Sequence, residues 1–433
     1  MRRGDGRTPG AERPGRARAR RRPTTVAAVA GLALVALGGC TGGGTAAPTP
    51  AGSASSGSAS SGPAAGPTAT SSATPSAPPS SAAPSPSPSA TRDPLAGWTL
   101  EEKVGQLLMV GVNVARPGAA TRAALVEDHV GGLFLHGRSQ ASVEAVRELV
   151  DGYRADAREG SRAPLLVSTD QEGGQVQVLQ GPGFSRIPSA VAQAGLDPAA
   201  LRADAAGWGG ELRAAGVDVN LAPVADLVPE GSAAANPPIG AFDRSYGFTP
   251  ASVVAGAGAF AGGMLDAGVV PTIKHFPGLG RVGANTDTSA GVTDEVTTAD
   301  AESVDVFREL VDAAPGAWVM TSTAVYARID DGAPAAFSPA VVDGLLREKL
   351  GFDGVVVTDD LSAAEQVQAW SPGERAVRAI AAGNDVVLAS ARPGVVDEMA
   401  DALVDRAEED PAFAEQVDEA ARRVLAAKAS LPR

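Results

Sequence analysis

The sequence predicts a (β/α)8 barrel of the TIM type over residues 94–433, preceded by a signal peptide and a disordered linker. Eight apolar runs alternate with alanine-rich segments of helical period in this region. Most of these runs are continuous rather than alternating, as expected of strands that are buried on both faces. Eight strand and helix pairs fit a closed barrel better than an open sheet. A doubly wound open sheet is the alternative architecture.

The first 39 residues have the three parts of a secretory signal peptide. A basic run spans residues 2–22, an apolar segment spans residues 26–37, and small residues follow before Cys40. This order is typical of a cleaved leader, and the apolar segment is too short to span a bilayer comfortably. We therefore expect the protein to be exported from the cytoplasm.

Cys40 is the single cysteine of the chain, which excludes a disulfide framework and a cysteine-based metal site. Its context, Leu37-Gly38-Gly39-Cys40, resembles a bacterial lipobox, in which the thiol is lipidated and becomes the mature N-terminus. On this interpretation the protein is extracytoplasmic and is anchored to the cell membrane by a lipid on Cys40. An ordinary signal peptide that ends near a cysteine is the alternative.

The segment after Cys40 has the composition of a flexible tether. Between residues 41 and 91 the chain contains only Ala, Ser, Pro, Gly and Thr. Such a segment cannot bury enough apolar area to offset the entropy of ordering it. We therefore expect a disordered tether over residues 40–93 and a folded domain over residues 94–433.

The charge of the chain limits its partners. The formal net charge is −14, and it becomes −21 without residues 1–39, because these carry nine arginines and two acids. An acidic protein repels nucleic acid and anionic headgroups. We therefore expect no nucleic-acid partner and no polyanionic substrate held over a wide surface. We also expect the protein to be a monomer.

Polar residues collect at one end of the expected barrel. The expected strands are residues 106–112, 130–135, 163–169, 217–224, 269–274, 317–324, 354–358 and 385–389, and helical segments such as residues 143–158, 250–267, 338–350 and 374–382 lie between them. Active-site groups of such a barrel lie just after the carboxyl ends of its strands. The polar residues found there are Asp170 and Glu172 after the third strand, Asp226 and Arg244 after the fourth, Lys274 and His275 after the fifth, and Asp359 and Asp360 after the seventh.

The fifth strand and its loop, residues 268–289, are the stretch richest in such groups. They offer a cation at Lys274, a ring nitrogen at His275 and a carboxylate at Asp287 among several glycines. Donors, a cation and a carboxylate at one strand end are what a site for a polar ligand needs. Asp170 precedes a pair of glycines, which let a ligand approach the backbone.

Some of these residues have simpler explanations. Asp226 can cap a turn, and Arg244 can form a surface ion pair. Asp359 and Asp360 are adjacent, so their side chains point apart and at most one of them faces the barrel mouth. His136, at the end of the second strand, is a further candidate.

No metal or phosphate-binding motif is visible in the sequence. Three histidines without His-x-x-x-His spacing, and no usable cysteine, speak against zinc. The glycines form neither a phosphate loop nor a strand-linked GxGxxG. We therefore expect no metal and no cofactor, which leaves carboxylate chemistry.

Five motifs resemble those of glycoside hydrolase family 3. They are DQEGG at 170–174, NLAPVADL at 220–227, DRSYG at 243–247, KHFPG at 274–278 and GFDGVVVTDDLSAA at 351–364. The resemblance is strongest to single-domain bacterial β-N-acetylglucosaminidases, which act on wall-derived sugars. It implies a (β/α)8 barrel with a carbohydrate substrate. It also implies hydrolysis of β-glycosides with retention, through a covalent glycosyl-enzyme.

The resemblance also implies roles for individual residues. Asp359 matches the family nucleophile, and Asp170, Arg244, Lys274 and His275 match positions that bind sugar hydroxyls. The nucleophile has to be ionised, and the cations Lys274 and Arg244 favour the charged form of Asp359.

The loop after the fifth strand departs from the family pattern. Single-domain members carry Asp-Ser-His there, with the histidine as general acid/base, whereas this chain reads Asp287-Thr288-Ser289. Leu279 and Gln175 also replace a histidine and an arginine of the family motifs. General acid catalysis is worth about 10² to 10⁴ in rate. Asp287 is the remaining candidate acid, provided that burial raises its pKa.

We therefore predict a retaining β-glycosidase, most closely a β-N-acetylglucosaminidase. The alternatives are a glycan-binding lipoprotein with weak or no turnover, a β-glucosidase and a glycoside phosphorylase. The sequence does not decide between an N-acetyl group and a hydroxyl at the 2-position of the sugar.

Overall fold

A computed structural model describes residues 93–431 of the chain. The predicted signal peptide, the predicted lipidation site at Cys40 and the predicted tether up to residue 92 lie outside the described residues. Within the described part, no helix is long and apolar enough to cross a membrane.

Eight parallel strands form a nearly closed barrel in the order β12-β9-β7-β6-β3-β2-β1-β13. They are β1 (Leu108–Asn113), β2 (Gly132–His136), β3 (Leu166–Thr169), β6 (Val219–Asn220), β7 (Val270–Phe276), β9 (Trp318–Thr321), β12 (Val356–Thr358) and β13 (Val387–Ala389). Between β12 and β13 the contact is a single bridge, Val357 to Val386, with a hydrogen bond from Thr358 N to Val386 O (2.9 Å). Each strand falls within or overlaps one of the eight expected runs. The barrel prediction is confirmed, and the doubly wound sheet is wrong.

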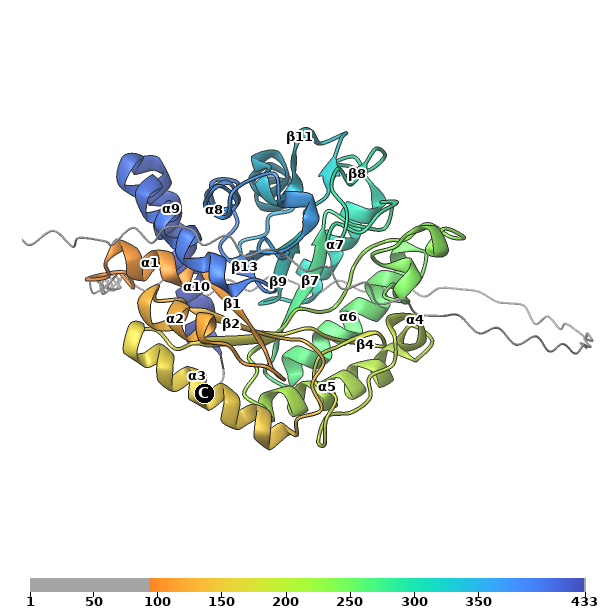
Figure 1. The fold of residues 1–433 in the computed structure, drawn as a ribbon. Coiled ribbons are helices and arrows are strands. Elements are labelled where there is room, and N and C mark those ends of the chain that lie inside the picture. The colour runs from red at the N-terminus through yellow and green to blue at the C-terminus, as the bar shows by residue number, and fades with distance from the viewer. Residues whose placement is uncertain (1–92, 432–433) are drawn as a thin grey trace, which may run out of the picture. The chain divides into compact units, whose positions relative to one another are not determined.

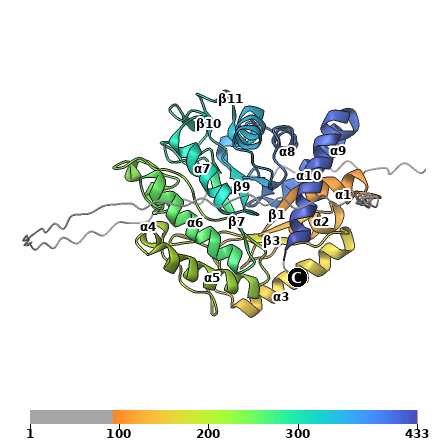
Figure 2. The same cartoon turned by 180° about the vertical axis from the view of Figure 1, so that it is seen from behind.

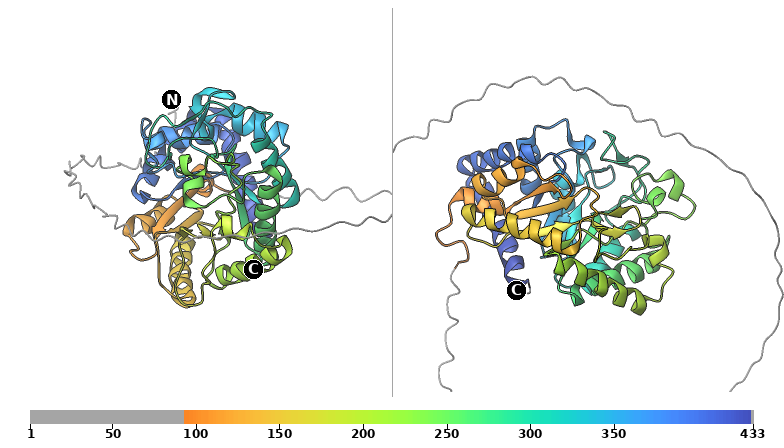
Figure 3. Two further views of the ribbon diagram at one scale, coloured as in Figure 1. Left: turned by 90° about the vertical axis from the view of Figure 1, so that its right-hand side faces the viewer. Right: turned by 60° about the horizontal axis from the view of Figure 1, so that its bottom comes forward.

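Helices surround the strands, as Figures 1 and 2 show from opposite sides and the left panel of Figure 3 from a third direction. They are α1 (Leu100–Gln106), α2 (Ala119–Glu127), α3 (Val143–Gly160), α4 (Ala190–Gln193), α5 (Pro198–Ala214), α6 (Pro250–Asp266), α7 (Glu302–Ala313), α8 (Pro372–Ala381), α9 (Val396–Glu409) and α10 (Pro411–Ser430). Ser142, Thr249 and Ser371 cap α3, α6 and α8 through their side-chain oxygens. The helix expected over residues 338–350 is a π-helix, η4 (Ala340–Lys349).

Two small sheets lie outside the barrel sheet. One pairs β4 (Gln171–Gly173) with β5 (Val176–Gln177), and the other contains β8 (Thr293–Asp294), β10 (Val325–Tyr326) and β11 (Asp330–Pro334). Both are built from segments that follow barrel strands, so they order the loops at the carboxyl ends of those strands.

The hydrophobic core has two layers, and neighbouring residues of one strand enter different layers. Met109 and Phe134 belong to the cluster that includes Trp318 and fills the barrel. Their neighbours Val110 and Leu133 belong to the cluster between the strands and the helices. Both faces of the strands are therefore buried, which explains why the apolar runs in the sequence are continuous.

Candidate active site

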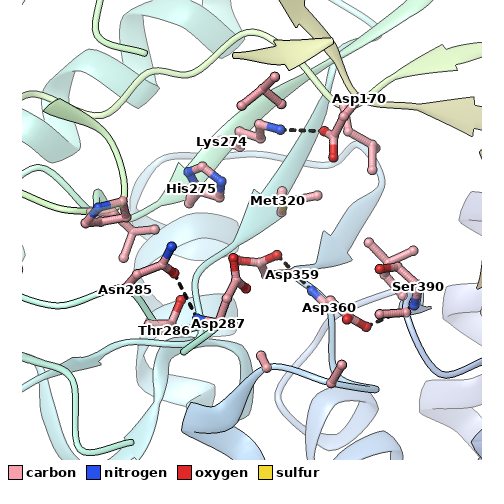
Figure 4. Close-up of a pocket in the computed structure, with 18 of the residues that line it drawn as sticks. Asp170, Lys274, His275, Asn285, Thr286, Asp287, Met320, Asp359, Asp360 and Ser390 are labelled. Carbon is pink, nitrogen blue, oxygen red and sulfur yellow. Dashed lines mark hydrogen bonds and ion pairs between the residues drawn. The ribbon is translucent and has the colours of Figure 1, made fainter. Parts of the chain in front are cut away.

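A cavity of about 370 Å³ lies at the carboxyl ends of the barrel strands (Figure 4). Its lining includes the six residues that the sequence indicated for catalysis or sugar binding, namely Asp170, Arg244, Lys274, His275, Asp287 and Asp359. Further lining residues include Phe134, Asn285, Met320, Asp360 and Ser390. The structure thus brings all six candidates into one site, and their chemical roles stay predictions.

Barrel strands and their loops place these side chains. Lys274 and His275 belong to the end of β7, and Asp359 directly follows β12. Arg244 comes from the long loop between β6 and α6, and Asp287 from the loop between β7 and β8. Because these loops start at the same end of the barrel, residues more than a hundred positions apart in the sequence face one cavity.

The loop that carries Asp287 is fixed to the loop that follows β12. Glu365 N donates a hydrogen bond to Asp287 O (3.2 Å). The side-chain amide of Gln366 exchanges two hydrogen bonds with the backbone of Val292, at 2.8 and 3.1 Å. These contacts hold the backbone of Asp287 in place relative to Asp359, which begins the same β12 loop.

Three charged side chains form a buried ion network around Glu172. Lys274 Nζ lies 2.7 Å from Asp170 Oδ1 and 2.6 Å from Glu172 Oε1. Arg244 binds the same glutamate in a bidentate manner, with Nε 2.8 Å from Oε2 and Nη2 2.7 Å from Oε1. The surface ion pair considered for Arg244 is therefore wrong, because its partner is buried. The sequence marked Glu172 as polar, but only the structure shows that it holds both cations.

The network stays charged at neutral pH. Burial alone would raise the pKa of Glu172, but the charges and hydrogen bonds of Arg244 and Lys274 outweigh burial and lower it to about 2. Burial alone would lower the pKa of Lys274, but the charges of Asp170 and Glu172 outweigh it and raise that pKa above its usual value. The side chain of Asp170 is 28% exposed and that of Glu172 is 7% exposed. The Asp170 carboxylate is therefore accessible to a ligand, whereas the Glu172 carboxylate holds the side chains of Lys274 and Arg244 in position.

His275 is held by the fully buried carboxylate of Asp226. Nδ1 of His275 lies 2.7 Å from Asp226 Oδ2. The other oxygen of Asp226 accepts hydrogen bonds from His275 N (3.2 Å) and Leu279 N (2.7 Å). Asp226 thus caps the turn, as considered from the sequence, and it also orients the imidazole. Nδ1 is engaged, so Nε2 is the ring nitrogen left for a ligand in the cavity.

The adjacent aspartates Asp359 and Asp360 have different environments. Asp360 Oδ1 accepts hydrogen bonds from Ser362 N (2.8 Å), Ser362 Oγ (2.6 Å) and Ser390 N (2.9 Å), so this carboxylate ties the loops after β12 and β13 together. Asp359 accepts one hydrogen bond, from Asp360 N to Oδ1 (2.8 Å). Figure 4 shows the Asp359 carboxylate next to that of Asp287. Oδ2 of Asp359 has no hydrogen-bond partner among residues 93–431, and its carboxylate lies beside that of Asp287, whereas the Asp360 carboxylate is bound to Ser362 and Ser390. Asp359 is therefore the member of the pair that is placed for chemistry with Asp287.

Asp287 has the electrostatic properties of a general acid. The surrounding protein desolvates its carboxyl group, although solvent in the cavity reaches this side chain. Desolvation, together with the negative charges of Asp359 and Asp360, raises the pKa of Asp287 to about 6, against the opposing effect of Arg244 and His275. A carboxyl group with this pKa is protonated in a large fraction of molecules near pH 6.

No second histidine takes the place of the one missing from the loop. All three histidines of the chain lie in the described part, and His275 alone among them lines the cavity. His136 ends β2 outside the cavity lining, and Nδ1 of His129 contacts Gly160 O on the outside of the barrel. His136 stacks on Phe134, which lines the cavity, so a role for His136 near the site stays a prediction.

The chain belongs to glycoside hydrolase family 3, as the motifs indicated. The model of the glycosyl hydrolase family 3 N-terminal domain matches residues 99–427. A β-hexosaminidase from Alkalilimnicola ehrlichii is 37% identical over 299 residues, which are 67% of this chain and 82% of that protein. The β-hexosaminidase LpqI from Mycobacterium tuberculosis is 34% identical over 343 residues, which are 76% of this chain and 83% of that protein.

Solved structures agree with this assignment. The crystal structure of a β-N-acetylhexosaminidase from Beutenbergia cavernae matches with a TM-score of 0.75 and 57% identity, over 76% of this chain and 98% of that chain. A family 3 β-N-acetylglucosaminidase from Paenibacillus matches with a TM-score of 0.69 and 35% identity, over 76% of this chain and 62% of that chain. The protein is thus a glycoside hydrolase of this family by both sequence and fold.

Proposed function

We propose that the protein is a retaining β-N-acetylhexosaminidase that releases N-acetylglucosamine from the non-reducing end of extracytoplasmic, wall-derived sugars. The observation that carries this proposal is the pair of adjacent carboxyl groups, Asp287 and Asp359, in a cavity of about 370 Å³ lined by sugar-binding candidates. The names of the relatives support N-acetylglucosamine over glucose.

In the first chemical step, Asp359 attacks the anomeric carbon of the sugar and Asp287 protonates the leaving-group oxygen. The free Oδ2 of Asp359 forms a bond to the anomeric carbon while the bond from that carbon to the leaving-group oxygen breaks. Asp287 gives its proton to this oxygen, so the leaving group departs as an alcohol. The products are a glycosyl ester of Asp359 and an ionised Asp287.

In the second step, the same two residues release the sugar. Glycosylation removes the negative charge of Asp359, which is one of the causes that raise the pKa of Asp287. The pKa of Asp287 therefore falls when the residue has to act as a base. Its carboxylate takes a proton from water, the water oxygen bonds to the anomeric carbon, and Asp359 leaves with its charge restored.

Aryl β-glycosides test the proposed activity. We expect turnover of the aryl β-N-acetylglucosaminide with a much higher kcat/KM than that of the aryl β-glucoside. We expect free N-acetylglucosamine as the product whether or not inorganic phosphate is present. Formation of the sugar 1-phosphate in phosphate buffer would identify a phosphorylase, and equal rates on both glycosides would remove the 2-acetamido preference.

We also propose that the enzyme is a monomer anchored to the outer face of the cell membrane by a lipid on Cys40. Replacing the anchor residue, Cys40→Ala, should move the protein from the membrane pellet to the soluble fraction, because a lipid anchor needs the thiol. Fractionation with immunoblotting measures this. Retention of Cys40→Ala in the pellet after a high-salt wash would disprove the lipid anchor.

A further inference from the structure

A second large cavity, of about 560 Å³, lies at the opposite end of the barrel from the candidate active site. It is bounded by α3, by the end of α5 and by the last turn of α10, with the segments that lead into β3 and β6 at its base. The right panel of Figure 3 shows the blue α10 ending close to the yellow α3. We call this cavity the basal groove. Its charged lining residues are Arg147, Arg154, Arg158, Arg213, Asp218 and Lys428.

The basal groove contains more positive than negative charge, in a chain with a net charge of −14. Its one acidic lining residue, Asp218, is shared by two arginines: Arg154 Nη2 lies 3.0 Å from Oδ2, and Arg213 Nη1 lies 3.4 Å from Oδ1. Arg147 pairs with Asp151 on the same helix at 3.0 Å. The groove therefore forms a local basic site on an acidic protein.

Arg158 is the cation of this groove that is most available to a ligand. It is exposed, and no ion pair joins it to any carboxylate within residues 93–431. It lies four residues after Arg154 on α3, so both side chains project from the same face of the helix. A guanidinium group offers a planar set of donors that matches an oxyanion in a bidentate manner.

Lys428 is a buried amine that has no acidic partner within residues 93–431. Its relative exposure is 7%, and Nζ donates to Gln106 Oε1 (2.7 Å) and Gly131 O (2.8 Å). An ammonium group has three donors, so one is left after these two bonds. In the described structure, no carboxylate lies within ion-pair distance of this Nζ. Burial lowers the pKa of Lys428 to about 7, against the charge of Asp218. An anion in the groove would favour the charged form of Lys428 and would raise this pKa.

We propose that the basal groove binds a ligand through a phosphate group, with Arg158 at the rim and Lys428 at the base. Several donors that surround one cavity favour a phosphate group, which offers up to four oxygens to them, over a carboxylate, which offers two. The overall acidity of the protein does not prevent this, because charges further away than about 8 to 10 Å are largely screened in physiological salt. The phosphate can belong to a soluble ester or to the headgroup of a phospholipid.

Binding measurements on the chain from residue 41 onward separate these sources, because this protein carries neither a lipid nor the basic, apolar segment of residues 1–39. Inorganic pyrophosphate, followed by calorimetry, probes soluble phosphate. Sedimentation with phosphatidylcholine vesicles, with and without phosphatidylglycerol, probes phospholipid headgroups. We expect at least one probe to bind. Binding of pyrophosphate alone assigns a soluble ligand, and sedimentation that depends on phosphatidylglycerol assigns a lipid headgroup.

Charge variants test the position of the site. Arg158→Glu should weaken the binding of the effective probe at least tenfold, and Lys428→Met should weaken it as well, with thermal unfolding measured for both variants. The matched control is Arg308→Glu, because Arg308 is 50% exposed, lies on α7 and pairs with Asp305 three residues earlier. Hydrolysis of the aryl glycoside should be unchanged in Arg158→Glu, since the two cavities share no lining residue.

Two results would overturn the proposal. One is the absence of binding by both pyrophosphate and phosphatidylglycerol vesicles. The other is equal weakening by Arg158→Glu and Arg308→Glu, which would mean that the response follows net charge and not this groove. Neither result depends on whether the enzyme cleaves N-acetylglucosaminides, so failure here is distinct from failure of the proposed activity.

Discussion

The Asp359→Ala variant is expected to lose turnover by about 10⁴-fold or more, because removing the nucleophile of a covalent mechanism removes the intermediate itself. The matched control is Asp360→Asn. This variant removes the neighbouring charge but keeps the oxygen that accepts hydrogen bonds from Ser362 and Ser390. Asp360→Asn should therefore keep most of the activity. Initial rates on an aryl β-N-acetylglucosaminide measure both variants.

Covalent trapping gives an independent readout of the same residue. An activated 2-fluoro glycoside should label the protein once, on the peptide that holds Asp359, because the fluorine slows the breakdown of the glycosyl ester. Peptide mapping by mass spectrometry locates the label. A label on another residue, or equal loss of activity in Asp359→Ala and Asp360→Asn, would contradict the assignment of the nucleophile.

Sequence reasoning was most accurate where local patterns are tied to the barrel geometry. The apolar runs gave the strands, because each barrel strand is buried by the interior on one face and by helices on the other, as with Met109 and Val110. The position of Asp359 after its strand placed it in the cavity for the same reason. The carboxylates of Asp359 and Asp360 point apart, as expected of adjacent residues at a strand end. Both residues line the cavity, however, so the expectation that at most one of them faces the barrel mouth was wrong.

Contacts between distant segments could not be predicted in this way. Glu172 meets Arg244 72 residues away in the sequence, and no local pattern shows that this glutamate also holds Lys274. Asp226 had the sequence context of a turn cap, and its bond to the His275 ring depends on the path of the β7 loop. The basal groove is a stronger example, because Arg158 on α3 and Lys428 on α10 line one cavity although they are 270 residues apart in the sequence.

The pH dependence should identify Asp287 as the group that has to be protonated. The free enzyme needs a protonated Asp287, so kcat/KM should fall as the pH rises through about 6. The carboxyl groups of Asp287 and Asp359 interact, so the observed pKa belongs to the pair. The decline above pH 6 should disappear in Asp287→Asn. A decline that persists in this variant would assign it to another residue.

A comparison of substrates with different leaving groups tests whether Asp287 donates the proton. Asp287→Asn should slow the cleavage of alkyl or sugar β-N-acetylglucosaminides by about 10²-fold or more, because their alkoxide needs a proton to depart. The glycosylation step with dinitrophenyl glycosides should be almost unaffected, because dinitrophenolate leaves without a proton.

Azide should restore turnover of dinitrophenyl substrates by Asp287→Asn, because azide attacks the glycosyl-enzyme without base assistance and gives the β-glycosyl azide as product. Thr288→Ala, a change at the next and exposed position of the same loop, should behave like the unmodified protein.

Other outcomes have different meanings for the site. Equal slowing of both substrate classes in Asp287→Asn would show that Asp287 only orders its loop. The hydrogen bond from Glu365 N to the carbonyl oxygen of Asp287 already contributes to that order. Feeble cleavage of dinitrophenyl glycosides by the unmodified protein, with binding but no cleavage of natural disaccharides, would show that Asp287 does not replace the missing histidine. The cavity would then act in sugar recognition, because Lys274 and His275 can still bind hydroxyl groups when no proton is supplied. A pKa of about 6 for Asp287, next to the free oxygen of Asp359, is the physical reason to expect catalysis instead.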